Sequence, residues 1–168
     1  CRQEIWTYVG DIRRTLGVEA ALYFDVVWFV ENIMPELFPD FVFEVCTQEE
    51  LGDLHGKTIP RKNKICIRED VYIGACAENG RDRLTIAHEI GHFFMHDEHS
   101  IEFCQSSSNG KVPCFRDSDW QADVFGGELL APSYLIDGMS VSKIHEACKV
   151  SMPCAKSQLR AIERERVK

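Results

Sequence analysis

The segment from Arg83 to His96, RLTIAHEIGHFFMH, contains two histidines four residues apart and a glutamate directly after the first. On an α-helix, residues four apart lie on one face, so His88 and His92 can direct ring nitrogens at one point. Such a point can hold a zinc ion (Zn2+), for which imidazole is a common ligand. Glu89 lies about 100° further round the helix, where its carboxylate can accept a proton from zinc-bound water. The spacing therefore predicts a hydrolytic zinc site with Glu89 as general base.

A catalytic zinc takes three protein ligands and keeps one position open, so a third ligand is needed. The later segment DWQADVFGGELL, which we expect to be helical, offers two acidic candidates, Asp119 and Glu128. They are nine residues apart, about 900° of helix, so they point to opposite sides and cannot both reach the metal. We favour Asp119, because it lies on the side of the helix that should turn inward. The competing interpretation is that Asp119 is an acidic first-turn residue that the helix dipole favours.

Two further residues extend this predicted site. Asp123 lies one turn beyond Asp119 and could accept the outer N–H of a ligand histidine, a contact that fixes the ring orientation. His96 continues the four-residue series, but it lies two turns, about 11 Å, from His88 and cannot join the same site. His96 is expected either to line the cleft or to cap the helix C-terminus as a cation.

A glycine inside the motif helix also needs an explanation. Gly91 costs about 1 kcal/mol relative to alanine in a helix interior. Its small size would let another element approach the helix closely beside the ligands. Chance is the competing explanation for the histidine pair itself, and the acidic candidates on a second helix are what favour a metal site over chance.

The elements around the motif predict a mixed α+β fold. Helical periodicity indicates a helix over about Gln3 to Leu16, and a second from Glu19 or Phe24 to Met34 that ends before Pro35. Three short β-rich runs follow and predict a small sheet of about three strands, at residues 41–46, 56–60 and 64–68.

The second half of the chain is expected to be helical apart from one long loop. The motif helix should cover residues 81–96, and the acidic helix should run from about Ser118 to just before Pro132. Residues 97–117 read as a polar loop, in which His99, Cys104 and Cys114 are spaced too irregularly to predict a second metal site. Two tail helices are expected at residues 141–148 and 153–167, the last of them solvated because it is densely charged.

Composition limits the class of protein. The chain has 168 residues, 45% of them hydrophobic, which is enough for one compact domain with a real core. Its net charge of −8 disfavours direct nucleic-acid binding, which depends on clustered lysine and arginine.

The most apolar run, at residues 20–30, contains Asp25 and is shorter than the roughly 20 residues that span a bilayer, so no membrane association is expected. The eight cysteines lack the spacing of a disulfide scaffold, which favours reduced thiols in a cytoplasmic protein.

Taken together, RDRLTIAHEIGHFFMH and the later DWQADVFGGELLAP resemble the ImmA/IrrE family of zinc metallopeptidases. The family pattern is R-x-R-F-T-x-A-H-E-x-G-H-x-x-x-H, followed by E-W-Q-A-N/D-x-F-A-A-x-L-L-M-P. The resemblance implies a minimal zincin-like α+β domain over residues 1–168, with a core at about 41–137 and a helical tail at 138–168. It also implies one zinc held by His88, His92 and the acidic residue of the second segment. Here that residue is Asp119, one methylene shorter than the usual Glu, and the family's F-A-A becomes F-G-G.

The resemblance also implies a biological role. Family members cleave or otherwise inactivate a helix-turn-helix repressor, often in mobile elements or stress responses. In zincins a strand ahead of the motif borders the cleft, so we expect the strand with Ile65 and Ile67 to pair with an extended substrate. The leading hypothesis is a zinc-dependent endopeptidase that acts on a protein partner. The alternatives are a metal-bound module that inactivates a repressor by binding alone, and a purely structural metal, which would leave Glu89 unexplained.

Overall fold

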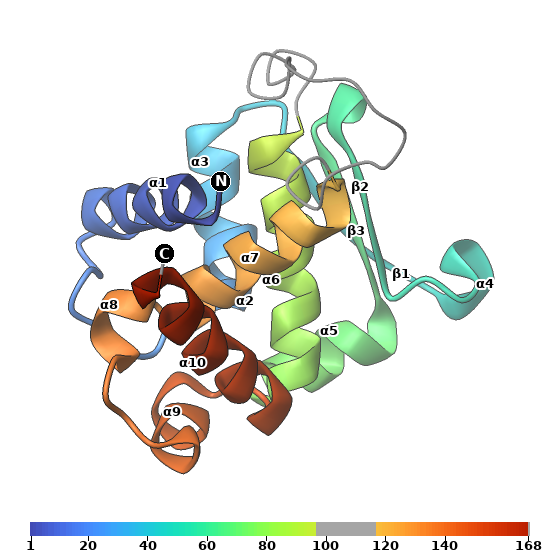
Figure 1. Cartoon of the computed structure of the whole chain (residues 1–168). Helices are drawn as coiled ribbons and strands as arrows, with labels where there is room; N and C mark the ends of the chain where they lie inside the picture. The colour runs from blue at the N-terminus through green and yellow to red at the C-terminus, as the bar shows by residue number, and fades with distance from the viewer. Residues whose placement is uncertain (97–116, 168) are drawn as a thin grey trace, which may run out of the picture.

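The histidine pair lies on a long helix near the middle of the molecule. In this computed structural model, which describes residues 1–96 and 117–167, α6 (Gly80–Met95) begins at Asn79, whose side chain accepts hydrogen bonds from two backbone N–H groups of the first turn. Ile86 and Ile90 on α6 are fully buried. Figure 1 shows the sheet on one side of α6, α1 on the other side, and α7 crossing α6. The motif helix is therefore held from both sides.

The predicted sheet of three strands is present, and the α+β fold class is confirmed. Its strands are β1 (Val42–Cys46), β2 (Gly56–Ile59) and β3 (Lys64–Arg68). The order is β1-β3-β2, with β1 parallel to β3 and β2 antiparallel to it. The strand that contains Ile65 and Ile67 is thus central, and both its edges are hydrogen-bonded within the sheet.

The acidic helix crosses the motif helix at very short range. α7 (Ser118–Leu130) packs across α6, as Figure 1 shows. A Cβ atom added to Gly91 would lie 3.0 Å from the Cα of Ala122, and one added to Gly126 would lie 3.1 Å from the backbone nitrogen of His88. The expectation that Gly91 admits a second element is confirmed. Gly126 has the same effect on α7, because it also lacks a side chain where the two helices cross.

The N-terminal helix completes this layer. α1 (Arg2–Thr15) packs on α7 and has the predicted extent to within one residue. Arg13 of α1 is fully buried and donates hydrogen bonds to the carbonyl oxygens of Leu129, at 2.6 Å, of Val18 and of Ala21. A single guanidinium thus joins α1 and its following loop to the end of α7.

The prediction that the second helix ends before Pro35 is wrong. The helical path continues through α2 (Val26–Trp28), a π-helical segment (Phe29–Ile33) and α3 (Met34–Leu37). The N–H of Met34 donates to the carbonyl of Phe29, five residues earlier. We attribute the continuation to this wider turn, which relieves the clash between a proline ring and the carbonyl four residues before it.

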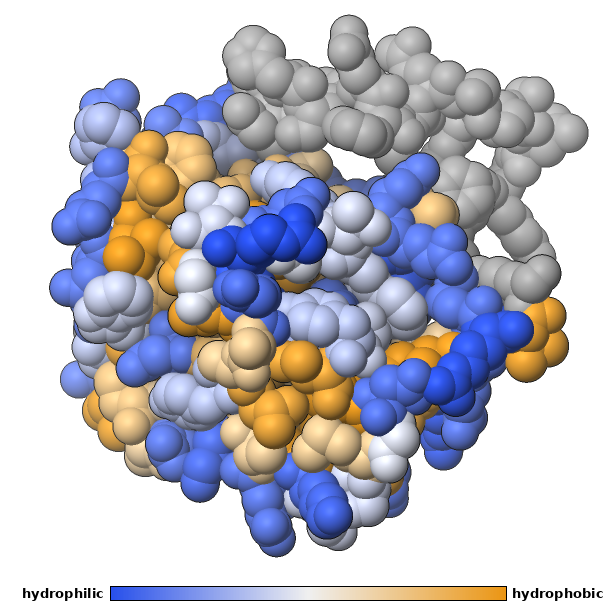
Figure 2. Space-filling model, turned by 90° about the vertical axis from the view of Figure 1, so that its left-hand side faces the viewer, coloured by the Kyte–Doolittle hydropathy of each residue, from blue (hydrophilic) through white to orange (hydrophobic). Residues whose placement is uncertain are grey.

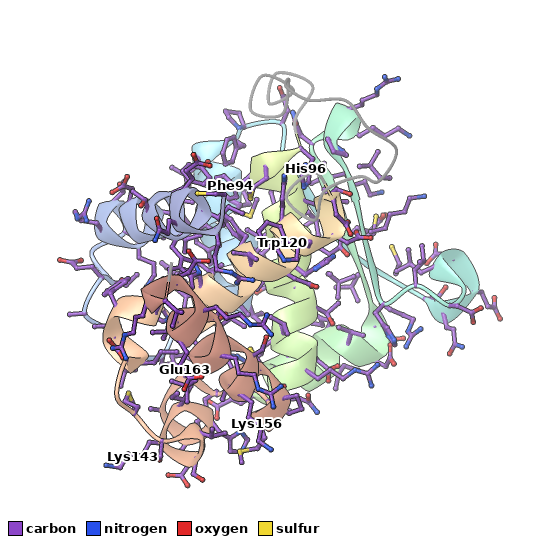
Figure 3. All side chains as sticks on the ribbon, viewed as in Figure 1. Phe94, His96, Trp120, Lys143, Lys156 and Glu163 are labelled. Carbon is purple, nitrogen blue, oxygen red and sulfur yellow. The ribbon has the colours of Figure 1, made fainter. Side chains whose placement is uncertain are left out.

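The remaining elements lie around this centre. They are α4 (Gln48–Leu51), a short 3-10 helix (Pro60–Lys62), α5 (Glu69–Cys76), α8 (Ser133–Ile136), α9 (Val141–Cys148) and α10 (Met152–Arg166). The prediction of a solvated last helix is wrong for one face of α10, where Ala155 and Ile162 are buried. Lys156 and Glu163 on its other side are exposed (Figure 3). The predicted loop, including His99, Cys104 and Cys114, falls on residues 97–116, which lie outside the described residues.

On the side that carries α1 and α8, the described residues form apolar patches that polar side chains separate. Figure 2 looks onto this side and shows polar and apolar side chains interspersed. Within residues 1–96 and 117–167, no helix is both long and apolar enough to cross a bilayer.

Candidate metal centre

The two histidines of the motif meet at their Nε2 atoms. His88 and His92 stand one turn apart on α6, with ring centroids 4.6 Å apart and Nε2 atoms 3.0 Å apart. Both side chains are mostly buried, at 23% and 18% exposure. The helix therefore presents two nitrogen ligands to one point, as their spacing predicts.

The structure brings Asp119, and not Glu128, to this point. Asp119 lies in the first turn of α7, with its Oδ1 atom 3.3 Å from Nε2 of His92. Ligand atoms of His88, His92 and Asp119 all lie within 4.8 Å of one another. The expectation that Asp119 lies on the inward side of α7 is wrong, because its side chain is 77% exposed, whereas Glu128 at the opposite end of the helix is fully buried. Oε1 of Glu128 accepts hydrogen bonds from the N–H and hydroxyl of Ser133, both at 2.9 Å.

The distances from His92 to the other two side chains fit a tetrahedral zinc ion. With metal–ligand bonds of about 2.0–2.1 Å, tetrahedral geometry separates two nitrogen or oxygen ligands by about 3.3 Å. The observed separations are 3.0 Å between the histidine nitrogens and 3.3 Å between His92 and Asp119. Two imidazoles and one carboxylate are also a usual ligand set for catalytic zinc.

Asp123 orients the first histidine. Its Oδ1 lies 2.8 Å from Nδ1 of His88, one helical turn beyond Asp119. A proton held at Nδ1 leaves Nε2 of the same ring free to bind a metal. Asp123 thus occupies the position that the sequence predicted for a partner behind the ligand.

Without a metal, the pKa values of the two imidazole rings shift in opposite directions. Burial lowers the pKa of His88, but the Asp123 hydrogen bond and nearby carboxylates outweigh it, and the net effect is a raised pKa. Burial, together with the charge of His88, lowers the pKa of His92. Without a metal, His88 therefore holds a second proton more readily than His92 does.

Glu89 lies beside this cluster, against the sheet. It is 7% exposed, and burial raises the pKa of its carboxyl although a hydrogen bond from Thr58 opposes the shift. The Thr58 hydroxyl lies 2.6 Å from Oε2 of Glu89. A Cβ at Gly56 would lie 2.8 Å from Cγ of Glu89, so only a glycine on β2 leaves room for this side chain. Sequence reasoning missed both β2 residues, since nothing in their local pattern indicates which helix they face.

The other predicted site residues do not join the ligands. His96 ends α6, with its ring 5.3 Å from that of His92 and its Nε2 3.2 Å from the carbonyl oxygen of Ser118 (Figure 3). Burial lowers its pKa, which disfavours the predicted role as a cationic cap. The predicted cleft position of Ile65 and Ile67 is wrong, because both are fully buried in the core.

Comparison with known proteins agrees with this geometry. Residues 42–145, well over half of the chain, match the peptidase family described as the IrrE N-terminal-like domain. The chain belongs to this family. The match covers the sheet, α6 and α7, and so includes every residue of the IrrE-like candidate site described above. No curated protein matches the chain. Family membership supports a metallopeptidase-like function.

Proposed function

We propose that this IrrE-like protein is a zinc-dependent endopeptidase that hydrolyses a peptide bond in a protein partner. The observation that carries the proposal is the convergence of His88, His92 and Asp119 within 4.8 Å, with Glu89 on the same helix beside them. A purely structural metal would not require a carboxylate held next to its ligands. Glu89 is held in this way by Thr58.

Each residue has a distinct part in the proposed reaction. His88, His92 and Asp119 would hold the zinc, which when bound makes water a nucleophile near neutral pH and polarises a carbonyl oxygen. Glu89 would accept the proton of the attacking water and return it to the leaving amine. Burial suits Glu89 to this exchange, because it raises the affinity of the carboxylate for a proton.

The structure favours β2 as the strand that binds the substrate. In the sheet formed by the described residues, β2 pairs with β3 alone, so its other edge can accept a further strand. An extended peptide adds to such an edge through backbone hydrogen bonds. Thr58 of β2 contacts Glu89, so a peptide on this edge would run beside the proposed base. This role of β2 replaces the one predicted for the strand with Ile65 and Ile67.

We infer that the partner is a helix-turn-helix repressor. The resemblance of the motif segments to ImmA/IrrE peptidases supports this class of substrate. The charge of the chain also supports it, because a DNA-binding surface is basic and the present chain carries a net charge of −8. Opposite charges accelerate the encounter of two proteins.

The test is incubation of the protein with helix-turn-helix proteins encoded beside its gene, followed by mass spectrometry of the products. Zinc-loaded protein should cut one of them at a defined bond. Glu89→Gln should retain the metal and lose cleavage by a factor of about 10²–10⁴, the usual contribution of a general base. Undiminished cleavage by this variant would contradict the role of Glu89. Inactivation of the partner by this variant without cleavage would instead support a binding module.

A further inference from the structure

A second group of metal-ligating side chains lies on the face of the sheet that points away from α6. Thr58 contacts Glu89 on α6, and its register partner Ile65 is buried on that same face. Side chains alternate along a strand, so Cys66 points to the opposite face. Its register partner on β1 is Glu44, and Cys46 follows two residues later on the same side.

These three side chains converge on one point. Oε2 of Glu44 lies 3.5 Å from Sγ of Cys46 and 3.7 Å from Sγ of Cys66. All three ligand atoms lie within 4.8 Å of one another. A tetrahedral zinc with Zn–S bonds of about 2.3 Å and Zn–O bonds of about 2.0–2.2 Å separates a sulfur ligand from an oxygen ligand by about 3.5 Å. The carboxylate oxygen is therefore spaced from each sulfur as two ligands of one ion would be, and the two sulfurs lie within 4.8 Å of each other.

We propose that Glu44, Cys46 and Cys66 form a second metal site, for zinc or a softer divalent ion such as cadmium. Two sulfur ligands favour such ions over magnesium or calcium, which prefer oxygen. Both cysteines are free thiols in the structure and are almost fully buried, whereas Glu44 is exposed and opens the site to solvent. The site is independent of the proposed peptidase centre, because the two share no residue.

A lysine would compete with a metal ion for the carboxylate of this site. The ammonium of Lys64 forms an ion pair with Oε2 of Glu44, the same oxygen that faces both sulfurs. Binding of a divalent ion would form bonds to two sulfurs and one carboxylate oxygen. Two thiol protons would pass to solvent, and the Lys64 ammonium would leave Oε2 for water. Lys64 therefore weakens the site, and its removal should strengthen metal binding.

The proposed site joins two strands that are distant in sequence. Glu44 and Cys46 belong to β1, which pairs only with β3 in the sheet of described residues, and Cys66 belongs to β3. An ion held by all three residues would cross-link the parallel pair. Metal binding should therefore raise the melting temperature of the full chain, and this effect should require both strands.

The test is titration of the full reduced chain with cadmium, followed by the ultraviolet charge-transfer absorption of cadmium–thiolate bonds. Histidine and carboxylate ligands do not give this absorption, so His88→Ala/His92→Ala should retain it. Cys46→Ser/Cys66→Ser should lose it. Glu44→Gln should weaken cadmium binding by at least the roughly 10–100-fold that follows loss of a residue behind a metal ligand. Lys64→Met should tighten binding.

Cys76 supplies the matched control, because it is an exposed cysteine outside the cluster. Cys76→Ser should leave the absorption and the affinity unchanged. The proposal is overturned if Cys46→Ser/Cys66→Ser keeps the full absorption. It is equally overturned if Glu44→Gln and Lys64→Met both bind cadmium as the unmodified chain does. These two substitutions are at partly exposed positions, so they test the site even if the double cysteine variant fails to fold.

Discussion

The hydroxyl of Thr58 lies 2.6 Å from Oε2 of Glu89 and 2.9 Å from the backbone carbonyl oxygen of the same residue. One side chain of the edge strand therefore contacts both the carboxylate and the main chain of the proposed base. Because this strand is also the one proposed to pair with the substrate, the contact couples the positions of peptide and base.

Replacement of Thr58 tests that coupling. Thr58→Val should reduce kcat about 10-fold or more, because a hydrogen bond to a charged group contributes about 1.5–3 kcal/mol. Zinc content should not change, because Thr58 is not among the proposed ligands. Thr58→Ser restores a hydroxyl and should recover most of the activity. If Val and Ser variants cleave equally fast, the hydroxyl does not position Glu89.

The close crossing of α6 and α7 yields a prediction about the third ligand. Where ImmA/IrrE peptidases carry Glu and Ala, the present chain carries Asp119 and Gly126. Gly126 lets α7 approach α6 to a distance at which the shorter Asp119 reaches His92. Gly126→Ala should force the helices apart by a few tenths of an ångström and weaken zinc binding. Asp119→Glu should restore binding in that background but not improve it in the unmodified chain, as zinc dissociation constants will show.

Two single substitutions provide the controls for this series. Asp119→Ala should strongly weaken zinc binding, since it leaves a two-histidine site that chelators strip readily. Glu128→Ala should keep the zinc although it removes a buried side chain. A large loss of zinc with Glu128→Ala, and none with Asp119→Ala, would reverse the assignment of the third ligand.

The residue behind His88 should matter nearly as much as a ligand. Asp123→Ala removes the acceptor for the Nδ1 proton, and the ring is then free to rotate or to change tautomer. We expect zinc affinity to fall about 10–100-fold. Asp123→Asn keeps an acceptor oxygen and should lose less. Equal zinc affinities for the Ala variant and the unmodified chain would show that Asp123 is only a surface partner.

Glu128 predicts a pH dependence of stability. Burial raises the pKa of its carboxyl from 4.5 to about 7, and its Oε2 has no hydrogen-bond partner among the described residues. The folded protein thus retains a proton that the unfolded chain releases. The protonated carboxyl therefore contributes to the free energy of unfolding. This contribution is complete below pH 4.5 and is lost as the pH rises to about 7, a change of at most about 3 kcal/mol.

Glu128→Gln should remove this contribution. In urea unfolding, the stability of the variant relative to the unmodified chain should increase steadily between about pH 4.5 and 7.5 and then level off. A difference that is constant across this range would mean that Glu128 is ionised in the folded protein.

Local patterns predicted much of the fold and the gathering of the site residues. The four-residue spacing placed His88 and His92 on one helix face, and counting turns separated Asp119 from Glu128. Gly91 indicated a close neighbour, which proved to be α7. These inferences succeed because each depends on the geometry of a single helix.

Inferences that depended on long-range pairing were less successful. The alternation of Ile65 and Ile67 fits an edge strand and a central strand equally well, and only the partners β1 and β2 decide between them. Thr58 could not be connected to Glu89, because they are 31 residues apart and belong to different elements. The sequence predicts a helix end at Pro35, because a π-helical turn has no reliable sequence signature.

The contacts of Arg13 limit how far this protein can be truncated for expression. Its guanidinium is buried under the end of α7, yet it comes from a helix outside the family-matched segment 42–145. Val9 of the same helix and Ile162 of α10 also belong to the same buried core as Leu129 of α7. A fragment trimmed to the shared segment would expose that apolar surface and the Leu129 carbonyl to water. We therefore expect the family-matched segment to fold poorly on its own, and expression trials should retain both α1 and α10.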